Sequence, residues 1–304
     1  MRHLLGLRNV PAEEIISILD TAKSFRELLD RPVKKVPSLR GTTVVNLFFE
    51  NSTRTRLSFE LAEKRLSADL VNFSASGSSI SKGETLLDTV RNIEAMKIDL
   101  VVVRHSSAGV PGFISRNTEA IVLNAGDGSN EHPTQALLDL FTIRQEFADF
   151  KGLRVAIVGD IRYSRVARSN SWGLKTLGAN VVLCGPPTLM PRDLSRLGVE
   201  TTTSLEQAIR GADVVMALRV QRERQDSGYL ASEREYRANY GVTQERIHDW
   251  NPSAMVMHPG PVNRNVEIDS EVVDSSQSVI LEQVTNGVAV RMSTLYTLVG
   301  GANT

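Results

Sequence analysis

The stretch GTTVVNLFFENSTRTRLSFE, residues 41–60, joins two different patterns without a break. Its first half is a continuous apolar run rich in β-branched and aromatic residues, which predicts a buried strand that ends at Glu50. Its second half has helical spacing and predicts a helix that begins near Arg54. A buried strand followed directly by a helix is typical of an α/β fold with a parallel sheet.

The same alternation continues along the chain in two groups. Strand-like apolar runs of the first group lie at 41–50, 68–74, 98–106 and 119–126, with helical patterns at 54–66 and 84–97. Runs of the second group lie at 151–160, 178–186, 211–220 and 252–260. We therefore predict an α/β protein of two tandem three-layer α/β domains with mainly parallel sheets, linked by a helix. The expected parts are a first domain at 1–133, a linking helix at 134–150, a second domain at 151–283, and a C-terminal helix at 284–304 that joins the first domain.

Composition excludes several classes of protein. Lys and Arg together number 35, as do Asp and Glu, so the whole chain offers no general attraction to nucleic acid or to an acidic membrane. Cys184 is the sole cysteine, which excludes an internal disulfide and a multi-cysteine metal site. The N-terminus turns charged too soon for a signal peptide, and no apolar run approaches the ~20 residues of a membrane span. We expect a cytoplasmic protein without nucleic-acid or membrane partners.

Hydroxyl and guanidinium groups fill the turn between the first strand and its helix, at Ser52, Thr53, Arg54, Thr55 and Arg56. Unpaired N–H groups and the dipole at a helix N-terminus favour an anion. A capping hydroxyl with arginines on a solvated face is the simpler interpretation, and it accounts for one hydroxyl and one arginine. Because it does not explain all five residues, the sequence predicts a phosphate site.

FFENSTRTRLSFE (48–60) resembles the carbamoyl phosphate signature of the aspartate and ornithine carbamoyltransferases. Five further stretches resemble, in order, motifs of the aspartate enzymes: GSSISKGETLLDT (77–89), DGSNEHPTQALLDL (127–140), VGDIRYSRVARS (158–169), LRVQRER (218–224) and HPGPVNR (258–264). Ornithine enzymes typically carry a His-Cys-Leu-Pro motif near the C-terminus, where this chain reads MHPGPVN. The resemblance therefore favours the aspartate branch of the family.

This resemblance implies transfer of the carbamoyl group of carbamoyl phosphate to the amino group of L-aspartate. The products would be N-carbamoyl-L-aspartate and phosphate, in pyrimidine (UMP) biosynthesis, with no cofactor and no metal. The first domain would then bind carbamoyl phosphate and the second L-aspartate. Two alternatives stay open: a carbamoyltransferase for another amino acid such as L-ornithine, and a non-catalytic scaffold of this fold. A dehydrogenase is disfavoured because Gly-x-Gly-x-x-Gly is absent after the strand at 151–160.

The resemblance implies roles for residues of the first domain. Ser52, Thr53, Arg54 and Thr55 would hold the phosphate, and Arg104 would contact both phosphate and carbonyl. His132 would donate to the carbamoyl oxygen and Gln135 would bind the carbamoyl amide. Without the resemblance, Arg104 could equally form a surface ion pair, and a histidine before proline is more often a loop or cap residue.

L-aspartate brings two carboxylates, which guanidinium groups bind in a bidentate manner. The resemblance assigns the aspartate site to Arg165, Arg219 and Gln221, and the last motif adds Gly260 and Pro261 to the substrate contacts. Taken locally, the arginines near 219–224 are simply a solvated charge run.

Further implied roles concern assembly and closure of the site. Lys82 and a loop serine, Ser78 or its neighbour Ser79, would reach into the active site of an adjacent chain, so that a homotrimer shares its sites. Glu50 would bridge the two domains by pairing with Arg165 and Arg224 once both substrates are bound; otherwise it is an acid turned to solvent. Regulatory chains or a dihydroorotase are possible partners.

Overall fold

The structure is a computed structural model, and it describes residues 1–74, 84–192, 197–221 and 232–302. Four residues of the predicted site, Ser78, Ser79, Lys82 and Arg224, lie outside this part of the chain. The serine-rich stretch 74–85, whose composition predicts a mobile surface loop, lies mostly outside it too.

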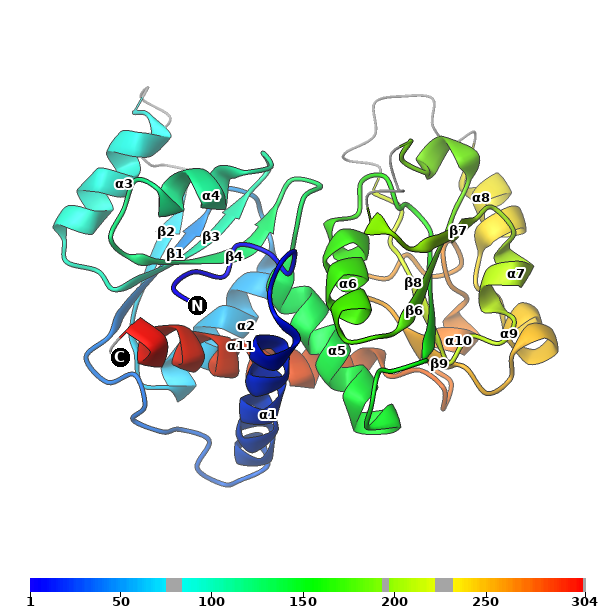
Figure 1. Cartoon of the computed structure of the whole chain (residues 1–304), viewed down its shortest axis with the longest axis horizontal. Coiled ribbons are helices and arrows are strands. Elements are labelled where there is room, and N and C mark those ends of the chain that lie inside the picture. Colours follow the sequence, from blue (N-terminus) through cyan, green and yellow to red (C-terminus); the bar gives the residue numbers. More distant parts are fainter. Residues whose placement is uncertain (75–83, 193–196, 222–231, 303–304) are drawn as a thin grey trace. The chain divides into compact units, whose positions relative to one another are not determined.

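Two compact units make up the chain (Figure 1), one formed by Met1–Leu138 with Thr285–Thr304 and the other by Asp139–Val284. Two helices, α5 (Pro133–Phe147) and α11 (Ile280–Ala302), carry the backbone from one unit to the other. The boundary between the units falls inside α5, after Leu138. Within the described residues, no helix combines the length and apolar character needed to span a bilayer.

The sheet of the first unit has the order β2-β1-β3-β4, and every neighbouring pair is parallel. Its strands are β1 (Thr43–Phe48), β2 (Asp69–Ser74), β3 (Leu100–His105) and β4 (Ile121–Asp127). In the register of this sheet, Asn46 of β1 stands beside Asn72 of β2, and Phe48 stands beside Arg104 of β3. Since successive side chains of a strand face opposite sides of the sheet, residues that are neighbours in this register share one face.

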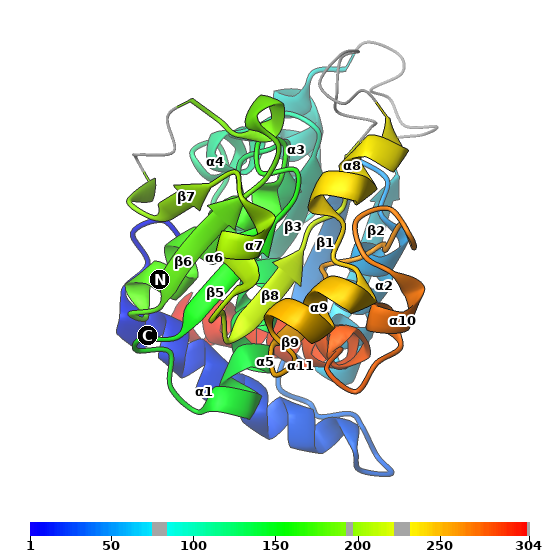
Figure 2. The ribbon, with the colours of Figure 1, turned by 90° about the vertical axis from the view of Figure 1, so that its right-hand side faces the viewer.

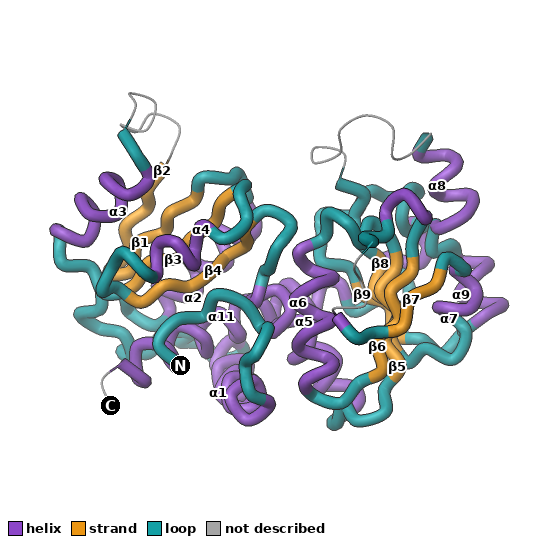
Figure 3. The backbone as a smooth tube through the Cα atoms, turned by 45° about the horizontal axis from the view of Figure 1, so that its top comes forward, coloured by secondary structure: helices purple, strands orange, loops and turns teal. Residues whose placement is uncertain are grey.

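Helices cover both faces of this sheet (Figures 1 and 3). On one face, α3 (Leu86–Ala95) and α4 (Val110–Ser115) pack their apolar residues against the strands, in a core cluster of Val45, Leu47, Val90, Ile93, Val101, Val103, Ile114 and Val122. The other face is covered by α2 (Thr53–Arg65) and α11, with α1 (Ala12–Leu29) beyond them. Ser293 of α11 donates to the carbonyl of Ile18 in α1 at 2.6 Å, which ties these two helices together.

The sheet of the second unit has the order β7-β6-β5-β8-β9 and is also parallel throughout. Its strands are β5 (Arg154–Val158), β6 (Asn180–Cys184), β7 (Glu200–Thr202), β8 (Val214–Ala217) and β9 (Met255–Met257). Figure 2 shows α7 (Leu205–Ile209), α9 (Gln244–Trp250) and α10 (Ser270–Val273) in front of this sheet, and α6 (Arg165–Thr176) covers its other face. The remaining elements are η2 (Pro187–Leu189) and α8 (Glu233–Tyr240).

The predicted fold class, two parallel α/β sheets with helices on both faces, is confirmed. Each predicted strand run overlaps an observed strand that is shorter than the run, and β4 extends one residue beyond its run, to Asp127. The sequence analysis missed β7 because its three residues are polar and two of them are exposed at the edge of the sheet.

Candidate active site

The strand order of the first sheet creates one edge position that suits a ligand. The chain leaves β1 through α2 on one face of the sheet and leaves β3 through α4 on the other face. Since β1 and β3 are neighbours, the segments that follow them diverge at their carboxyl ends. Open α/β sheets bind ligands at such switch points.

Ser52 organises the turn that follows β1. It is the N-cap of α2, and its Oγ accepts a hydrogen bond from the Thr55 amide at 3.4 Å. The first turn of this helix carries no acidic residue, so no carboxylate of its own offsets the positive end of the dipole. Thr53 and Arg54 are exposed, while Ser52 and Thr55 are half-buried. The turn thus places backbone amides, hydroxyl residues and an arginine at one helix N-terminus, a position that favours an anion.

Arg56 behaves differently from the residues that precede it. Its Nε lies 3.5 Å from Oε1 of Glu60, one turn further along α2. This is an i,i+4 ion pair between an exposed arginine and a partly exposed glutamate on the side of the helix. Of the five residues in the turn, Arg56 fits the simpler interpretation of an arginine on a solvated face.

Arg104 and Glu50 meet at the carboxyl edge of the first sheet. Nη2 of Arg104 donates to Oε1 of Glu50 at 2.7 Å, and Nη1 donates to the carbonyl of Ala125 at 3.1 Å. The Arg104 side chain is 9% exposed and that of Glu50 is 21% exposed. Arg104 is therefore not a surface ion pair, and Glu50 is not an acid turned to solvent. Phe48, two residues before Glu50, is the neighbour of Arg104 in the sheet, which brings this guanidinium to the start of the turn.

His132 and Gln135 lie at the start of α5, and both are buried. The Gln135 amide donates to the His132 carbonyl at 3.0 Å, which closes the first turn of the helix. The chain reaches this point from the end of β4, so the two side chains belong to the same sheet edge as Arg104.

Two carboxylates that the sequence analysis did not select fix the turn before His132. The Glu131 carboxylate accepts hydrogen bonds from the amides of Leu7 at 2.7 Å and Arg8 at 3.3 Å. The Asp127 carboxylate accepts from the amides of Gly109 at 2.6 Å and Glu131 at 3.2 Å. Both carboxylates are buried, and buried charges of this kind need such donors. The acids at both ends of DGSNE are the local signal in the sequence, whereas the amides of Leu7, Arg8 and Gly109 that they accept from lie far away along the chain.

The second sheet has a corresponding switch point between β5 and β8. The chain leaves β5 toward β6 on one side and reaches β8 and β9 on the other. Asp160, which follows β5, is fully buried; its carboxylate accepts from the amides of Tyr163 at 3.1 Å and Gln221 at 3.3 Å. This one carboxylate therefore ties the segment after β5 to the segment after β8.

The residues predicted to bind aspartate lie on these two segments. Ser164 caps α6 by accepting from the Ala167 amide at 3.1 Å, and the next residue, Arg165, is buried. Arg219 and Gln221 follow β8 and are half-buried. The fold brings together Arg165, Arg219 and Gln221 at one sheet edge, although 54 positions or more separate the first from the others in the sequence.

Gly159 is required at this edge by its backbone and its surroundings. Its φ of +135° is one that L-residues rarely adopt, and an added Cβ would lie 3.0 Å from both Leu218 and the hydroxyl of Tyr236. The segment after β5 can therefore approach β8 closely only with glycine here.

Gly260 and Pro261 follow β9, the neighbour of β8, and are joined by a cis peptide bond. The Gly260 amide donates to Nδ1 of His258 at 2.8 Å, so a neutral His258 carries its proton on Nε2. Nε2 lies 3.2 Å from Oε1 of Glu267, and both side chains are buried. This buried pair holds the Gly260–Pro261 segment at the carboxyl end of β9.

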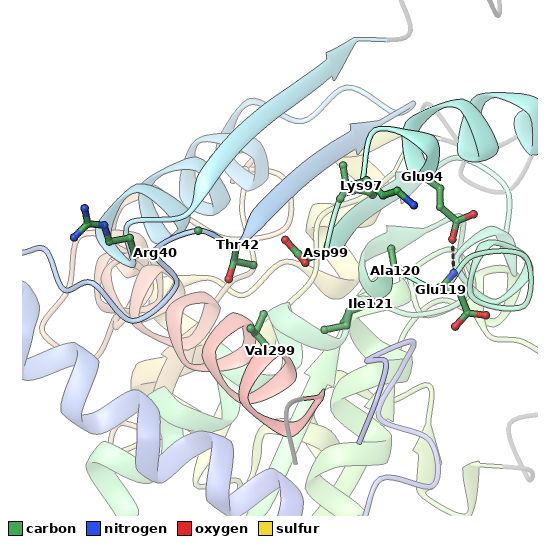
Figure 4. A pocket seen from close by; sticks show the side chains of 11 residues that line it. Arg40, Thr42, Glu94, Lys97, Asp99, Glu119, Ala120, Ile121 and Val299 are labelled. Carbon is green, nitrogen blue, oxygen red and sulfur yellow. Dashed lines mark hydrogen bonds between the residues drawn. The ribbon is translucent and has the colours of Figure 1, made fainter.

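A pocket of about 630 Å³ lies at the opposite edge of the first sheet, near the amino ends of β1, β3 and β4 (Figure 4). Its carboxylates already serve local structure: Asp99 accepts from the Thr43 amide at 2.7 Å, and Glu94 accepts from the Thr118 hydroxyl at 2.9 Å. Because none of the predicted site residues lines it, we do not assign the reaction to this pocket. Among the described residues, no cluster of three or more His, Cys, Asp or Glu side chains could hold a metal ion.

Family models match the two halves of the chain separately. Residues 2–145 match the carbamoyl-P binding domain of aspartate/ornithine carbamoyltransferases, and residues 151–298 match their Asp/Orn binding domain. The chain belongs to the aspartate/ornithine carbamoyltransferase family.

Within the aspartate/ornithine carbamoyltransferase family, one relative is the "aspartate carbamoyltransferase catalytic subunit" of Gemmatimonas aurantiaca. It is 57% identical over 300 residues, which cover 99% of this chain and 94% of the relative. A solved structure of aspartate transcarbamoylase from Trypanosoma cruzi, in complex with N-(phosphonacetyl)-L-aspartic acid, has a TM-score of 0.87 at 30% identity and covers 98% of this chain and 95% of that one. Ornithine carbamoyltransferase from Pyrococcus furiosus also has a TM-score of 0.87, at 29% identity, covering 99% and 97%. The fold alone therefore does not distinguish the two branches of the family.

Proposed function

We infer that this chain transfers the carbamoyl group of carbamoyl phosphate to the amino group of L-aspartate, forming N-carbamoyl-L-aspartate and phosphate. The observation that carries this inference is the 57% identity, over nearly the whole chain, to a protein named as the catalytic subunit of aspartate carbamoyltransferase. L-ornithine is the weaker candidate, because the stretch MHPGPVN lacks the cysteine typical of that branch.

Residues of the first unit suit the carbamoyl phosphate half of the reaction. We assign the phosphate to the turn formed by Ser52, Thr53, Arg54 and Thr55, where the helix N-terminus favours an anion. Attack by the amine forms a tetrahedral oxyanion before phosphate leaves, and Arg104 and His132 would donate hydrogen bonds to that oxygen.

The buried environment of these donors supports this assignment. Arg104 is held by Glu50 and by the carbonyl of Ala125, so its guanidinium is oriented before any substrate arrives. Preorganised donors in a site of low dielectric stabilise developing charge more than mobile donors in water. Gln135, at the start of α5, would bind the carbamoyl amide.

Residues of the second unit suit L-aspartate. Arg165 and Arg219 would each bind a carboxylate, and Gln221 would add a hydrogen bond. The carboxylate of Asp160 supports this role because it joins the two segments that carry them. Gly260 and Pro261 lie beyond the next strand and would complete the contacts to substrate.

Glu50 is paired with Arg104 in the structure, and we propose that substrate binding gives Glu50 different partners. Glu50 accepts a hydrogen bond from Arg104. With both substrates bound, Glu50 would pair instead with Arg165 and Arg224, and closure would hold the amine near the carbonyl. Release of Arg104 would leave its Nη2 for the substrate.

A homotrimer with shared active sites completes the proposal. Leu57 and Leu61 on α2 and Val71 on β2 have exposed fractions of 50%, 43% and 50%, an apolar area that a second copy of the chain would cover. The segment that carries Ser78 and Lys82 follows β2 directly in the sequence. Regulatory chains or a dihydroorotase would bind elsewhere on such a trimer.

Mixing two inactive variants tests the shared site. Lys82→Ala and Arg54→Ala chains should each be inactive alone, and hybrids should regain activity because some interfaces then join an intact turn to an intact loop. Well-mixed hybrid trimers that stay inactive would contradict sharing.

The reaction itself is tested by measuring carbamoyl transfer to L-aspartate and to L-ornithine with and without a chelator. We expect carbamoyl aspartate in both conditions, because arginines supply the positive charge that a metal would provide. Activity with L-ornithine alone, or activity that a chelator abolishes and zinc restores, would overturn the proposal. The molar mass of the same preparation should correspond to three chains.

A further inference from the structure

Glu63 is an acid buried inside the first unit, on the side of α2 that faces the sheet. Its exposed fraction is 0%, whereas Glu60 on the same helix is partly exposed and pairs with Arg56. An ionised carboxylate in such a place is costly unless donors surround it. None of the proposed substrate contacts involves Glu63.

Asn46 is the hydrogen-bond partner of Glu63, from the strand beneath the helix. Its Nδ2 donates to Oε2 of Glu63 at 3.0 Å and to Oδ1 of Asn72 at 3.2 Å. Asn46 and Asn72 are direct neighbours in the register of β1 and β2. Three side chains from one helix and two strands therefore form one buried cluster, in which both hydrogens of the Asn46 amide are used.

Two oxygens of this cluster remain to be satisfied. Oε1 of Glu63 and Oδ1 of Asn46 are both buried, and neither has a hydrogen-bond partner among the residues that the structure describes. If Glu63 is ionised, both atoms can only accept, and each costs the free energy of an unsatisfied buried group. If Oε1 of Glu63 carries a proton, it can donate to Oδ1 of Asn46. Both oxygens then have a hydrogen-bond partner.

The charges around Glu63 agree with a protonated state. Burial, the largest cause, and the nearby Glu60 raise the pKa of Glu63 to about 8, against the lowering effects of the Asn46 hydrogen bond and of Lys64. Glu60 and Lys64 are the charged groups that act on it from α2, and β1 and β2 present the neutral amides of Asn46 and Asn72. Near neutral pH the acid therefore keeps its proton.

We propose that Glu63 is a positioning residue for the phosphate-binding turn: as a neutral acid it forms two hydrogen bonds with the Asn46 carboxamide, and this pair fixes α2 on β1 and β2. The inference rests on the proposed function, since the same helix begins at Thr53 and presents Ser52–Thr55 to the phosphate. Because a helix moves as a rigid element, ionisation of the Glu63 carboxyl displaces the N-terminus of α2 as well. A second bond, from Nη1 of Arg291 to the Ser58 hydroxyl at 2.9 Å, holds the same helix from α11.

The test compares Glu63→Gln, Glu63→Ala and a control, Glu60→Gln, in the full-length chain. Glutamine reproduces the neutral acid, because its amide can donate to Oδ1 of Asn46 and its oxygen can accept from Nδ2. Glu60→Gln removes a carboxylate from the same helix but leaves the buried pair intact. Inorganic phosphate is the probe, with binding measured by calorimetry from neutral to alkaline pH, and the Glu63 carboxyl is followed by carbon NMR in labelled protein.

We expect the Glu63 carboxyl to titrate near its raised pKa. Glu63→Gln should bind phosphate like the unmodified chain at pH 7, within about twofold, and about tenfold better than it near pH 9, where ionisation breaks the pair only in the unmodified chain. Glu60→Gln should still lose phosphate affinity at alkaline pH, and Glu63→Ala should bind phosphate weakly at every pH.

Titration of Glu63 at an ordinary carboxyl pKa would contradict the proposed hydrogen-bonded pair of neutral Glu63 and Asn46. Equal pH profiles for the unmodified chain and a folded Glu63→Gln variant would overturn the positioning role, even if Glu63→Ala fails to fold. If the unmodified chain does not bind phosphate at all, the proposed function and the positioning role both fail, and the titration alone still decides whether the pair exists. If phosphate binds as expected but no carbamoyl aspartate forms, only the proposed reaction fails.

Discussion

Nη2 of Arg104 lies 2.7 Å from Oε1 of Glu50, at the edge where the first sheet meets the N-terminus of α2 and the turn that we propose binds phosphate. A carboxylate beside an anion site is unfavourable by Coulomb's law unless it has another task. In the structure this carboxylate orients a buried guanidinium, and we therefore expect Glu50 to compete with the substrate anion for Arg104.

Glu50→Gln should therefore strengthen the binding of inorganic phosphate. The amide oxygen can still accept from Arg104, while loss of the negative charge favours a nearby anion by about 1 kcal/mol, or about fivefold in affinity. Turnover to carbamoyl aspartate should fall in the same variant, because the amide cannot pair with arginines of the second unit as strongly. Calorimetry at low ionic strength measures the first effect. Glu119→Gln, which removes an equal charge at the opposite edge of the sheet, is the control; equal phosphate affinity in both variants would show that Glu50 does not compete for Arg104.

Arg219→Ala should separate the two substrates. Loss of a charged bidentate contact costs about 1.5–3 kcal/mol, so the apparent affinity for L-aspartate should fall by about 10- to 150-fold. Phosphate binding should stay nearly unchanged, since Arg219 follows β8 of the other sheet. Steady-state kinetics with each substrate varied in turn measures the difference. Arg210→Ala, which removes an exposed arginine paired with Glu206, should change neither value. Parallel losses for both substrates in Arg219→Ala would be evidence against an aspartate site there.

The raised pKa of Glu63 predicts how stability depends on pH. Between the ordinary value of 4.5 and the folded value of about 8, the folded chain keeps a proton that the unfolded chain has released. The free energy of unfolding should therefore fall as pH rises through this window, by about 1.4 kcal/mol per pH unit and a few kcal/mol in all. Urea unfolding at fixed protein concentration checks this against Glu63→Gln, whose stability should lack this component. Identical slopes for the two chains would mean that Glu63 is ionised in the folded state.

Gly6→Ala should disturb the turn before His132. A Cβ at Gly6 would lie 2.9 Å or closer to three atoms of the Glu131 carboxyl group, which must then leave the amides of Leu7 and Arg8. We expect a loss of about 1–3 kcal/mol in stability and a reduced turnover, because a buried carboxylate loses its donors. Thermal unfolding and the transfer assay measure both. Gly300→Ala in α11, where an added Cβ meets nothing, should be neutral or stabilising by up to about 1 kcal/mol. If both substitutions have the same small effect, Glu131 does not brace this turn.

Local patterns in the sequence determined the fold class and the first half of the site. Buried parallel strands read as continuous apolar runs, and a helix N-terminus is marked by its own cap, so both signals lie within a few neighbouring residues. Ser52 illustrates this: its hydrogen bond to the Thr55 amide spans three positions. The helix α1 could also have been predicted, because its buried residues recur at helical spacing: Ile15, Ile18, Leu19 and Ala22. The sequence analysis nevertheless placed no helix there.

Only the tertiary structure decided which charged groups share an environment. Glu50 and Arg104 are 54 positions apart, and Leu7 and Glu131 are 124 positions apart, so neither pair leaves a local signal. Their contact depends on the register of β1 with β3 and on the docking of the N-terminal segment beside β4. The protonation state of Glu63 is also a tertiary property. In the sequence, Glu63 followed by Lys64 on a helix indicates a solvated face, whereas burial against Asn46 favours the neutral acid.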